Sequence, residues 1–449
     1  MHDPRLLLFR ALLLDLLGQL LTLALIAWLP IWSDIPLGVK SFTGQGLWIV
    51  FVLLLYPLLG WLFGSYTILR WRRLALSVLL QRLFITAAVT LMVVAVARWL
   101  INPTEIVWLV NRRVQFLWMS ALTLWVLVVR LSLRKGLLLP EAPQLLLFAE
   151  PQEITNIFLA WRRIPQRENL CIVQSTGLSQ LLDDSEAPTL LVLSPAILRD
   201  PSLRDLLASL EMRDPNLLRI LSVISFFEQR QERLPPVLLG ETFLSYNDLP
   251  SAVTFSVQVQ LKRMADLFLS ASLLLITAPF VLFAGLLIWL EDSGPVLYCQ
   301  QRTGWLGRPF TVYKLRTMTV QPADAPARWT QPGDHRITAV GGLLRRVRLD
   351  ELPQLLNVLN GDMSLIGPRP ERLELETSLE QKIPHYRKRH WMRPGLSGWA
   401  QVCAPYASSI EDSDLKLSYD LYYLRHFSTW LDLVILMRTV KTILKASGR

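Results

Sequence analysis

The sequence predicts a membrane protein in three parts: an N-terminal four-helix transmembrane bundle, an α/β cytoplasmic domain, and an α-rich monotopic domain with a re-entrant membrane hairpin. Three observations predict this fold class. Apolar stretches fill the N-terminal third, short apolar runs alternate with polar segments in the middle, and a proline interrupts a later apolar segment that has basic flanks. We expect domain boundaries at residues 1–137, 138–255 and 256–449.

The composition indicates a membrane protein with anionic partners. The chain has 449 residues, of which 52% are hydrophobic, and its mean hydropathy of +0.36 is high for a soluble protein. A net charge of +10 suits anionic lipids or phosphate-bearing ligands, although nucleic acid would give the same signature. The three cysteines lack metal-ligand or disulfide-framework spacing, so we expect neither kind of site: Cys171, Cys299 and Cys403.

The predicted bundle consists of four apolar stretches: Leu6–Leu29, Leu47–Leu69, Phe84–Leu100 and Phe116–Leu131. Each comes near the roughly 20 residues that a helix needs to cross the hydrocarbon layer, and the third and fourth are the shortest. Basic residues lie before the first stretch, between the second and third, and at the end of the fourth: Arg5, Arg70, Arg72, Arg73, Arg82, Arg130, Arg134 and Lys135. The positive-inside rule then places the N-terminus, the second loop and everything after Lys135 in the cytoplasm, so we expect a multi-pass protein of the cytoplasmic membrane.

The segment from about residue 140 to residue 249 has the pattern of a Rossmann-like domain. Its short apolar runs alternate with more polar, helix-like segments, as in βα units around a parallel sheet: Leu145–Phe148, Leu170–Val173, Thr189–Leu193 and Ile220–Phe226. The first turn has no GxGxxG motif and carries Glu150 where phosphates would approach. We therefore expect a structural or assembly domain without a cofactor.

A fifth apolar segment, Leu267–Leu290, is interrupted by Pro279. Proline removes an amide donor and clashes with the carbonyl of Leu275, so the helix must bend, and Thr277 is a candidate partner for a freed carbonyl. Each arm of about 12 residues reaches only ~18 Å. Basic residues on both flanks favour the cytoplasmic side for both ends: Lys262, Arg263, Arg302, Arg308, Lys314 and Arg316. We predict a re-entrant helix at residues 262–290 with its break at Pro279; the alternative is an ordinary kinked span.

Two basic residues follow an alternating stretch after this segment. Residues 310–313 alternate as a strand would, which predicts that Lys314 and Arg316 project from the same face. Two cations on one face can clamp a diphosphate. A solvated basic strand would look the same.

The acidic pair Asp350-Glu351 precedes leucines at helical spacing, which predicts that the pair opens an amphipathic helix. Acids are common in a first helical turn, so an isolated pair is better explained as structural. Here, however, arginines surround the pair: Arg345, Arg346, Arg348 and Arg369. This set fits phosphoryl transfer, in which arginines spread the charge of the transferring group, one acid attacks, and the other holds Mg²⁺.

The stretch at residues 392–402 is rich in glycine and proline, which predicts a shaped loop, with Arg393 as a further substrate contact. The apolar pattern of residues 430–444 predicts an interfacial helix, and a core-packing helix is equally compatible with it. His385 and His390 are too irregularly spaced for a metal pair, and we expect both at the surface.

Several motifs of the C-terminal region, taken in order, resemble those of the bacterial sugar transferases, the polyprenyl-phosphate hexose-1-phosphate transferases. They are KRxxD from Lys262 to Asp266, the QRTG and YKLRTM runs, LDELPQLLNVLNGDMSLIGPRP, RPGLSGWAQV and DLYYLRHFSTWLDL. The resemblance covers about residues 260–449, and the preceding four-span region and Rossmann-like domain resemble the larger architecture of the family.

The resemblance implies a two-step transfer through a covalent intermediate. Asp350 would attack the sugar-bearing phosphorus of a UDP-sugar, UMP would leave, and polyprenyl (undecaprenyl) phosphate would then take the phosphosugar, as a first step of exopolysaccharide or other surface glycan biosynthesis. Glu351 would bind Mg²⁺, with Lys314, Arg345 and Arg369 among the phosphate contacts. Membrane lipids are further partners, nucleic acid is not, and a homodimer is left open.

Two departures from the family pattern stand out. Ala278 occupies the position where the family often has serine before the hairpin proline, and residues 403–406 replace an Asn-Gly-Arg that many members have after AQV. The identity of the sugar is therefore not predicted. Two other functions remain open from the sequence: a catalytically silent membrane scaffold for polysaccharide assembly, and a glycosyltransferase that moves the sugar without its phosphate.

Overall fold

A computed structural model of the chain describes residues 4–28, 46–66, 76–101, 112–135, 144–162, 171–172, 188–214, 217–240, 243, 256–319, 334–404 and 409–444. The chain divides into two compact units. The first comprises Met1–Leu147, Glu168–Leu191 and Arg204–Ile220, and the second comprises Phe148–Arg167, Val192–Leu203 and Leu221–Arg449.

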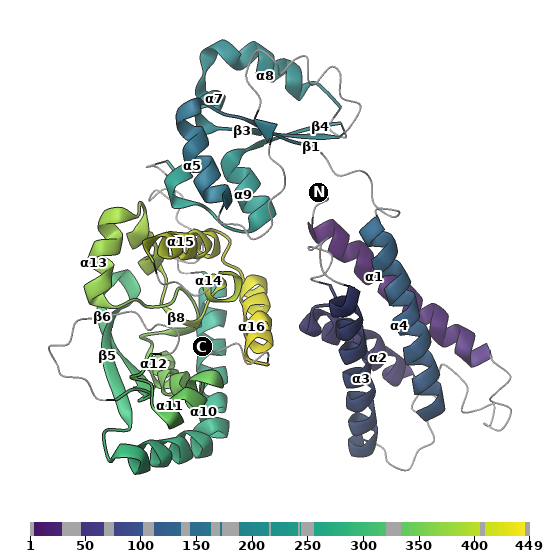
Figure 1. The fold of residues 1–449 in the computed structure, drawn as a ribbon, viewed down its shortest axis with the longest axis vertical. Helices are drawn as coiled ribbons and strands as arrows, with labels where there is room; N and C mark the ends of the chain where they lie inside the picture. Colours follow the sequence, from purple (N-terminus) through teal and green to yellow (C-terminus); the bar gives the residue numbers. More distant parts are fainter. Residues whose placement is uncertain are drawn as a thin grey trace. The chain divides into compact units, whose positions relative to one another are not determined.

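Four helices form the N-terminal part of the first unit (Figure 1): α1 (Pro4–Trp28), α2 (Gly46–Phe63), α3 (Leu76–Ile101) and α4 (Arg112–Lys135). Among the described helices, four are long and apolar enough to cross a membrane: Leu8–Ile26, Leu79–Leu100, Arg113–Leu133 and Val257–Asp292. The apolar helix Trp48–Phe63 is shorter, so the short member is the second rather than the third or fourth. Gly64, with a φ of 82°, ends α2 in the left-handed conformation typical of a helix C-terminus.

A buried ion pair joins α1 to α4 inside this bundle. Asp15 accepts hydrogen bonds from Arg130 at 3.2 Å and 2.5 Å, and both side chains are almost fully excluded from solvent. The ring of Tyr66 lies 4.9 Å from the guanidinium of Arg130. Gln19 is also fully buried, and neither atom of its amide has a hydrogen-bond partner among the described residues. The bundle therefore encloses a polar cluster that a hydropathy profile cannot locate.

We expect Asp15→Asn to destabilise the bundle, because it leaves the charge of Arg130 buried and uncompensated. Removing one partner of a buried pair costs about 3–5 kcal/mol. Thermal unfolding of the detergent-solubilised chain should show a lower Tm for Asp15→Asn and a recovery in the double variant Asp15→Asn/Arg130→Met. If the single and double variants unfold alike, the pair is not what holds α1 against α4.

The middle of the chain contains a four-stranded sheet with the strand order β2-β1-β3-β4: β1 (Gln144–Phe148), β2 (Cys171–Ile172), β3 (Thr189–Leu193) and β4 (Leu218–Ser222). β1 and β2 pair in parallel, with Leu146 opposite Cys171. The two central strands are buried almost throughout, which explains their unbroken apolar sequence. The run Ile220–Phe226 is not one strand, because the Ser222 side chain accepts from the amide of Ser225 at 3.0 Å and starts a helix.

Helices follow the strands in chain order: α5 (Pro151–Arg162) after β1, α7 (Pro195–Arg199), the 3₁₀ turn η6 (Pro201–Leu203) and α8 (Arg204–Glu211) after β3, and α9 (Val223–Gln231) after β4. Within the second unit, Trp161 of α5 stacks on Phe226 of α9. The side chain of Arg233 donates to the carbonyl of Ala160 at 2.6 Å. The amide of Leu234 donates to Ser418 of the C-terminal region at 2.8 Å, so the segment after α9 is built into the C-terminal core.

The C-terminal region combines short strands with many helices and turns. Its elements are η7 (Pro236–Leu238), α10 (Val257–Asp292), β5 (Leu297–Thr303), η9 (Trp305–Gly307), β6 (Pro309–Leu315), α11 (Ala339–Arg346), η10 (Leu349–Gln354), α12 (Leu355–Asn360), β7 (Ser364–Ile366), α13 (Leu373–Lys382), η11 (Tyr386–Trp391), β8 (Gly395–Ser397), α14 (Trp399–Cys403), α15 (Ile410–Arg425) and α16 (Thr429–Leu444). β5 and β6 form an antiparallel hairpin, and β7 pairs in parallel with β8.

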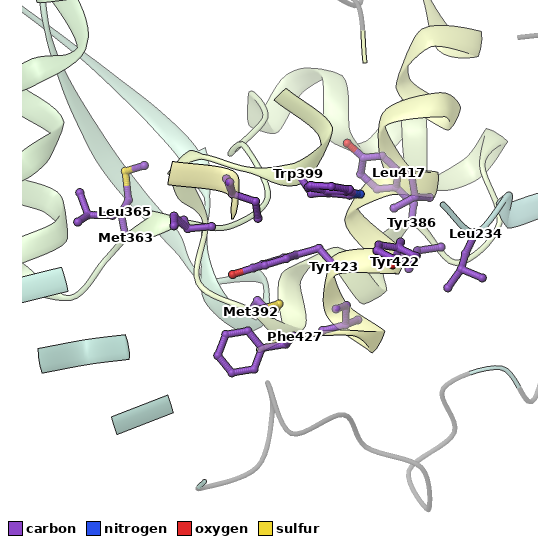
Figure 2. Packing of buried hydrophobic residues seen from close by; sticks show 14 of the residues in the cluster. Leu234, Met363, Leu365, Tyr386, Met392, Trp399, Leu417, Tyr422, Tyr423 and Phe427 are labelled. Atoms are coloured by element: carbon purple, nitrogen blue, oxygen red, sulfur yellow. The ribbon is translucent and has the colours of Figure 1, made fainter. Parts of the chain in front are cut away.

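A small hydrophobic cluster joins α10, β6 and α11, and one large cluster holds most of the other elements together. Figure 2 shows Trp399, Tyr422 and Tyr423 packed at its centre, with Leu234 contributed from the middle of the chain. Trp399 stacks on Tyr422 with ring centroids 6.1 Å apart. The large buried rings of this cluster are Tyr386, Trp399, Tyr422, Tyr423 and Phe427, and they share the cluster with Leu355, five residues after Asp350.

α10 is helical throughout its 36 residues and contains Pro279, so the predicted break in the helix is not seen. Instead the ribbon bends, as Figure 1 shows, and its second arm leads into β5. Thr277 donates to the carbonyl of Leu273 at 2.7 Å, not to that of Leu275, because the hydroxyl of a helical threonine reaches the carbonyl of the preceding turn.

Candidate active site

The acidic pair lies on η10, a 3₁₀ turn, and not at the start of an α-helix as the sequence predicted. Pro353 explains the difference, because it lacks the amide hydrogen that an α-helical turn would direct to the carbonyl of Leu349. The α-helix α12 begins only at Leu355. Arg348 enters the turn in the left-handed conformation, with a φ of 60°, which is strained for a residue with a side chain.

Three cations from different parts of the chain surround the carboxylate of Glu351. The Lys314 ammonium from β6 lies 3.4 Å from Oε1, and the Arg348 guanidinium lies 3.5 Å from Oε2. Arg369, in the segment after β7, contacts both carboxylate oxygens. The side chain of Glu351 is only 12% exposed, so this cage is shielded from solvent and its interactions are strengthened.

Asp350 is buried beside this cage. Burial and the charge of Glu351 raise the pKa of Asp350 to about 6, and Lys314, Arg345 and Arg369 oppose the rise. Burial would also raise the pKa of Glu351, but Arg369 and Lys314 hold it well below its usual range. Burial lowers the pKa of Lys314 to about 8. At neutral pH the site therefore presents an anionic Asp350 that is poorly solvated, next to a Glu351 that is fully paired.

The structure brings some predicted substrate contacts to the acidic pair and not others. Lys314 and Arg369 touch Glu351, and Arg345 acts on Asp350 electrostatically while its Nε donates to Thr317 at 2.9 Å. Arg316, expected on the same face as Lys314, instead pairs with Asp292 at the end of α10. This prediction is wrong because β6 ends at Leu315. The alternation of side chains between the two faces of a strand therefore does not continue to Arg316.

Arg393 braces the neighbouring backbone. Its Nε donates to the carbonyl of Gly361 at 3.1 Å, and its guanidinium stacks 4.8 Å above the ring of Trp305. Among the contacts that the structure describes, those of Arg393 lie at the turn after α12 and at η9. A role in substrate binding stays a prediction.

A buried ion pair behind Arg369 was not recognised from the sequence. Arg389 pairs with Asp420 at 2.9 Å, and both are more than nine-tenths buried. The same Arg389 donates to the carbonyl of Arg369 at 2.9 Å and to the hydroxyl of Tyr386 at 2.6 Å. The sequence signal for this ion pair was Asp420, which lies among apolar residues of α15. A charge on a buried helix face requires a partner.

Two residues in the first part of α10, Arg263 and Asp266, attach that helix to backbone groups that follow the acidic pair in sequence. Arg263 donates to the carbonyls of Val358 and Leu359 at 2.6 Å and 2.9 Å, which satisfies the free C-terminal end of α12. Asp266 accepts from the amide of Leu365 at 3.0 Å. Sequence reasoning used Arg263 as a topology signal and both residues as signs of a resemblance; the structure gives them an anchoring role.

The arrangement suits a nucleophilic carboxylate acting on a phosphate ester. A buried anion has a weakened hydration shell, and nearby guanidinium and ammonium groups can stabilise negative charge on a bound phosphate. Carboxylate oxygens are also the donors that Mg²⁺ prefers, usually one or two together with substrate phosphates. Glu351 is already paired with cations. The residues therefore fit Mg²⁺ when a bound diphosphate supplies further oxygens to the ion and pairs with these cations in place of Glu351.

Comparisons with known proteins match the C-terminal region, which contains the acidic pair and the cations around it. Residues 257–446 match the family model of bacterial sugar transferases. The chain is 42% identical over 205 residues to a protein of Aeromonas hydrophila named UDP-N-acetylgalactosamine-undecaprenyl-phosphate N-acetylgalactosaminephosphotransferase, an alignment that covers 46% of this chain and 48% of the relative. The chain thus spans about half the length of that relative.

Two further relatives are matched over most of their own length. A UDP-glucose:undecaprenyl-phosphate glucose-1-phosphate transferase of Caulobacter vibrioides is 41% identical over 212 residues, which cover 46% of this chain and 79% of the relative. The exopolysaccharide production protein PSS of Rhizobium leguminosarum is 42% identical over 186 residues, which cover 40% of this chain and 93% of the relative. By this identity and coverage, the chain belongs to the bacterial sugar transferase family.

Proposed function

We propose that this protein transfers a sugar-1-phosphate from a UDP-sugar to undecaprenyl phosphate at the bacterial inner membrane. The observation that carries the proposal is Asp350, a buried carboxylate beside a cage of cations around Glu351. The two named phosphotransferases and the exopolysaccharide protein among its relatives support the class of donor and acceptor and a place in surface glycan synthesis.

The proposed chemistry has two steps. A carboxylate oxygen of Asp350 forms a bond to the sugar-bearing phosphorus, and the bond from that phosphorus to the oxygen of the leaving UMP breaks. An oxygen of undecaprenyl phosphate then attacks the same phosphorus, and the bond to Asp350 breaks to regenerate the carboxylate. Lys314, Arg345 and Arg369 stabilise charge on the phosphates. Mg²⁺, held by Glu351 and phosphate oxygens, would supply further charge stabilisation when bound.

The proposal includes a re-entrant α10 with both ends on the cytoplasmic side. In a straight helix, Asp266 and Asp292 would lie about 39 Å apart. Yet Asp266 near one end and Asp292 at the other both bond to the C-terminal region. Between them, Leu275 is 78% exposed and Leu282 is 74% exposed. An apolar bend that protrudes from a domain anchored at both arms is suited to dip into one leaflet. The middle domain, with its order β2-β1-β3-β4, is proposed to be Rossmann-like and without a cofactor.

The test is incubation of the detergent-solubilised chain with a panel of UDP-sugars, undecaprenyl phosphate and Mg²⁺. Release of UMP together with a lipid-linked phosphosugar is the expected result. Release of UDP would show glycosyl transfer instead, and absence of turnover with every donor would support a silent scaffold. Cysteine labelling in intact spheroplasts tests the orientation: residues near Asp350 should be protected from a membrane-impermeant reagent.

We expect a bell-shaped pH dependence of kcat/KM. Protonation of Asp350, whose pKa is raised to about 6, removes the nucleophile as the pH falls. Deprotonation of Lys314, whose pKa is lowered to about 8, removes a positive charge as the pH rises. Activity should therefore fall about tenfold per pH unit outside these limits, measured from about pH 5 to about pH 9. Lys314→Arg should weaken the alkaline limb, because arginine stays charged. A profile flat across this range would contradict both assignments.

A further inference from the structure

A second cluster of ionisable side chains lies between α13 and η11. Glu376 and Glu380 are one turn apart on α13, so their carboxylates share a helix face, and His390 on η11 meets them. One ligand atom from each of these three residues lies within 4.8 Å of the other two. This cluster was not recognised from the sequence, because we expected His390 at the surface, whereas its side chain is buried.

Two buried atoms at the centre of the cluster face each other without a well-formed hydrogen bond. Oε1 of Glu376 and Nε2 of His390 lie within ion-pair distance of each other. Neither makes a hydrogen bond of acceptable geometry among the described residues, and Glu376 and His390 are 5% and 9% exposed. A carboxylate oxygen and a ring nitrogen held this close out of water require a positive charge between them, either an imidazolium proton or a metal ion.

We propose that Glu376, Glu380 and His390 form a binding site for a divalent transition-metal ion such as Zn²⁺, independent of the transferase chemistry. One imidazole nitrogen with two carboxylates is a donor set that suits Zn²⁺ and leaves a fourth position for water. Mg²⁺ prefers oxygen donors alone, so it is a poor candidate here and a good one at Glu351.

The local geometry can accept the ion with small movements. Ligand atoms of a tetrahedral zinc site, each about 2.1 Å from the metal, lie about 3.4 Å apart. The contact between Glu376 and His390 must therefore open, and Glu380 must approach. Glu380 is paired at 2.9 Å with Arg387, whose side chain is 82% exposed. Such a solvated pair is weak and is readily exchanged for a metal bond.

A metal at this place would clamp α13 to η11. The residue before His390 on η11 is Arg389, which donates to the carbonyl of Arg369. α13 follows the same segment that carries Arg369. The site therefore acts by stabilising the framework behind a phosphate-binding arginine, not by touching the substrate.

The experiment uses the full chain in detergent, freed of affinity tag, stripped of metal and dialysed against micromolar ZnCl₂, with bound zinc measured by inductively coupled plasma mass spectrometry. We expect about one equivalent of Zn²⁺ that is lost in His390→Ala and Glu376→Gln, and a zinc-dependent rise in Tm that is lost with it. Glu380→Gln should weaken binding at least about tenfold.

Two matched control variants test whether the loss of zinc is specific to the three proposed ligands. His385→Asn changes the neighbouring histidine, whose φ of 61° asparagine tolerates, and Glu374→Gln changes an exposed carboxylate of the same helix; both should keep the zinc. Glu351→Gln should also keep it, so failure of the proposed transferase chemistry leaves this result unaffected. Zinc retained by a correctly folded His390→Ala variant, or no zinc bound by the unaltered chain, overturns the proposal; in the latter case Glu376 and His390 form a plain carboxylate–imidazolium pair.

Discussion

Replacing Asp350 with asparagine is expected to abolish sugar-phosphate transfer, with a loss of at least about a thousandfold in kcat. The amide has the shape of the carboxylate but no anionic oxygen to attack phosphorus. In the unaltered chain the attacking oxygen is anionic only when Asp350 is deprotonated, and the pKa of this buried carboxyl is raised to about 6. The same variant should yield no phosphosugar adduct when the chain is incubated with the donor alone and weighed by intact-protein mass spectrometry.

Folding should survive this substitution and even improve. A raised pKa means that the folded state disfavours the charged form, so stability falls as the pH rises from the unfolded value towards about 6. A neutral asparagine escapes that penalty, and we expect a Tm equal to or a few degrees above that of the unaltered chain at neutral pH. Asp205→Asn, at an exposed position on α8, serves as the control and should retain activity. Turnover by the Asp350→Asn variant would contradict the assignment of Asp350 as the nucleophile.

Glu351→Gln should give the second largest loss, roughly a hundredfold or more in kcat/KM, together with lower stability. The substitution leaves Lys314, Arg348 and Arg369 converging on a neutral amide. These cations then repel one another, and the proposed Mg²⁺ loses its protein ligand. Activity should consequently respond only weakly to added Mg²⁺, whereas the unaltered chain should lose activity in EDTA and regain it with the ion.

The stability change of this variant has a predictable pH dependence. Arg369 and Lys314 hold the pKa of Glu351 well below its usual range against the effect of burial. The stabilisation by its charge is therefore present above the ordinary glutamate pKa and is lost as the pH falls through the folded value. The difference in Tm between the two chains should be widest near neutral pH and shrink in acid. Glu374→Gln is the control, and an equal change there would mean that any lost glutamate destabilises this region.

Local sequence rules succeeded where one element determines the answer. The apolar stretches became α1, α3 and α4 because hydropathy over about twenty residues is a property of the helix itself. β1 and β3 were recognisable because strands buried on both faces read as unbroken apolar runs. The acidic pair was recognised by its basic neighbours, and Glu351 is indeed surrounded by cations.

Local rules failed where the answer depends on the end of an element or on a distant partner. Pro353 turned the expected α-helix at Asp350 into a 3₁₀ turn. The end of β6 at Leu315 separated Arg316 from Lys314 and left Arg316 paired with Asp292. His390, expected at the surface, is buried against Glu376. For Arg316 and His390, one residue of phase, or one partner about fourteen or more residues away, decides where the side chain points.

The sequence by itself determined that this chain has several apolar helices, an α/β middle segment and a C-terminal region with the motifs of a sugar transferase, because hydropathy, periodicity and motif order are all local properties. Only the tertiary structure decided which cations meet Glu351, how Arg389 supports Arg369, and that α10 is anchored at both ends to one region. The physical reason is that ion pairs and backbone contacts between remote segments form where packing brings those segments together, and a linear chain does not record that distance.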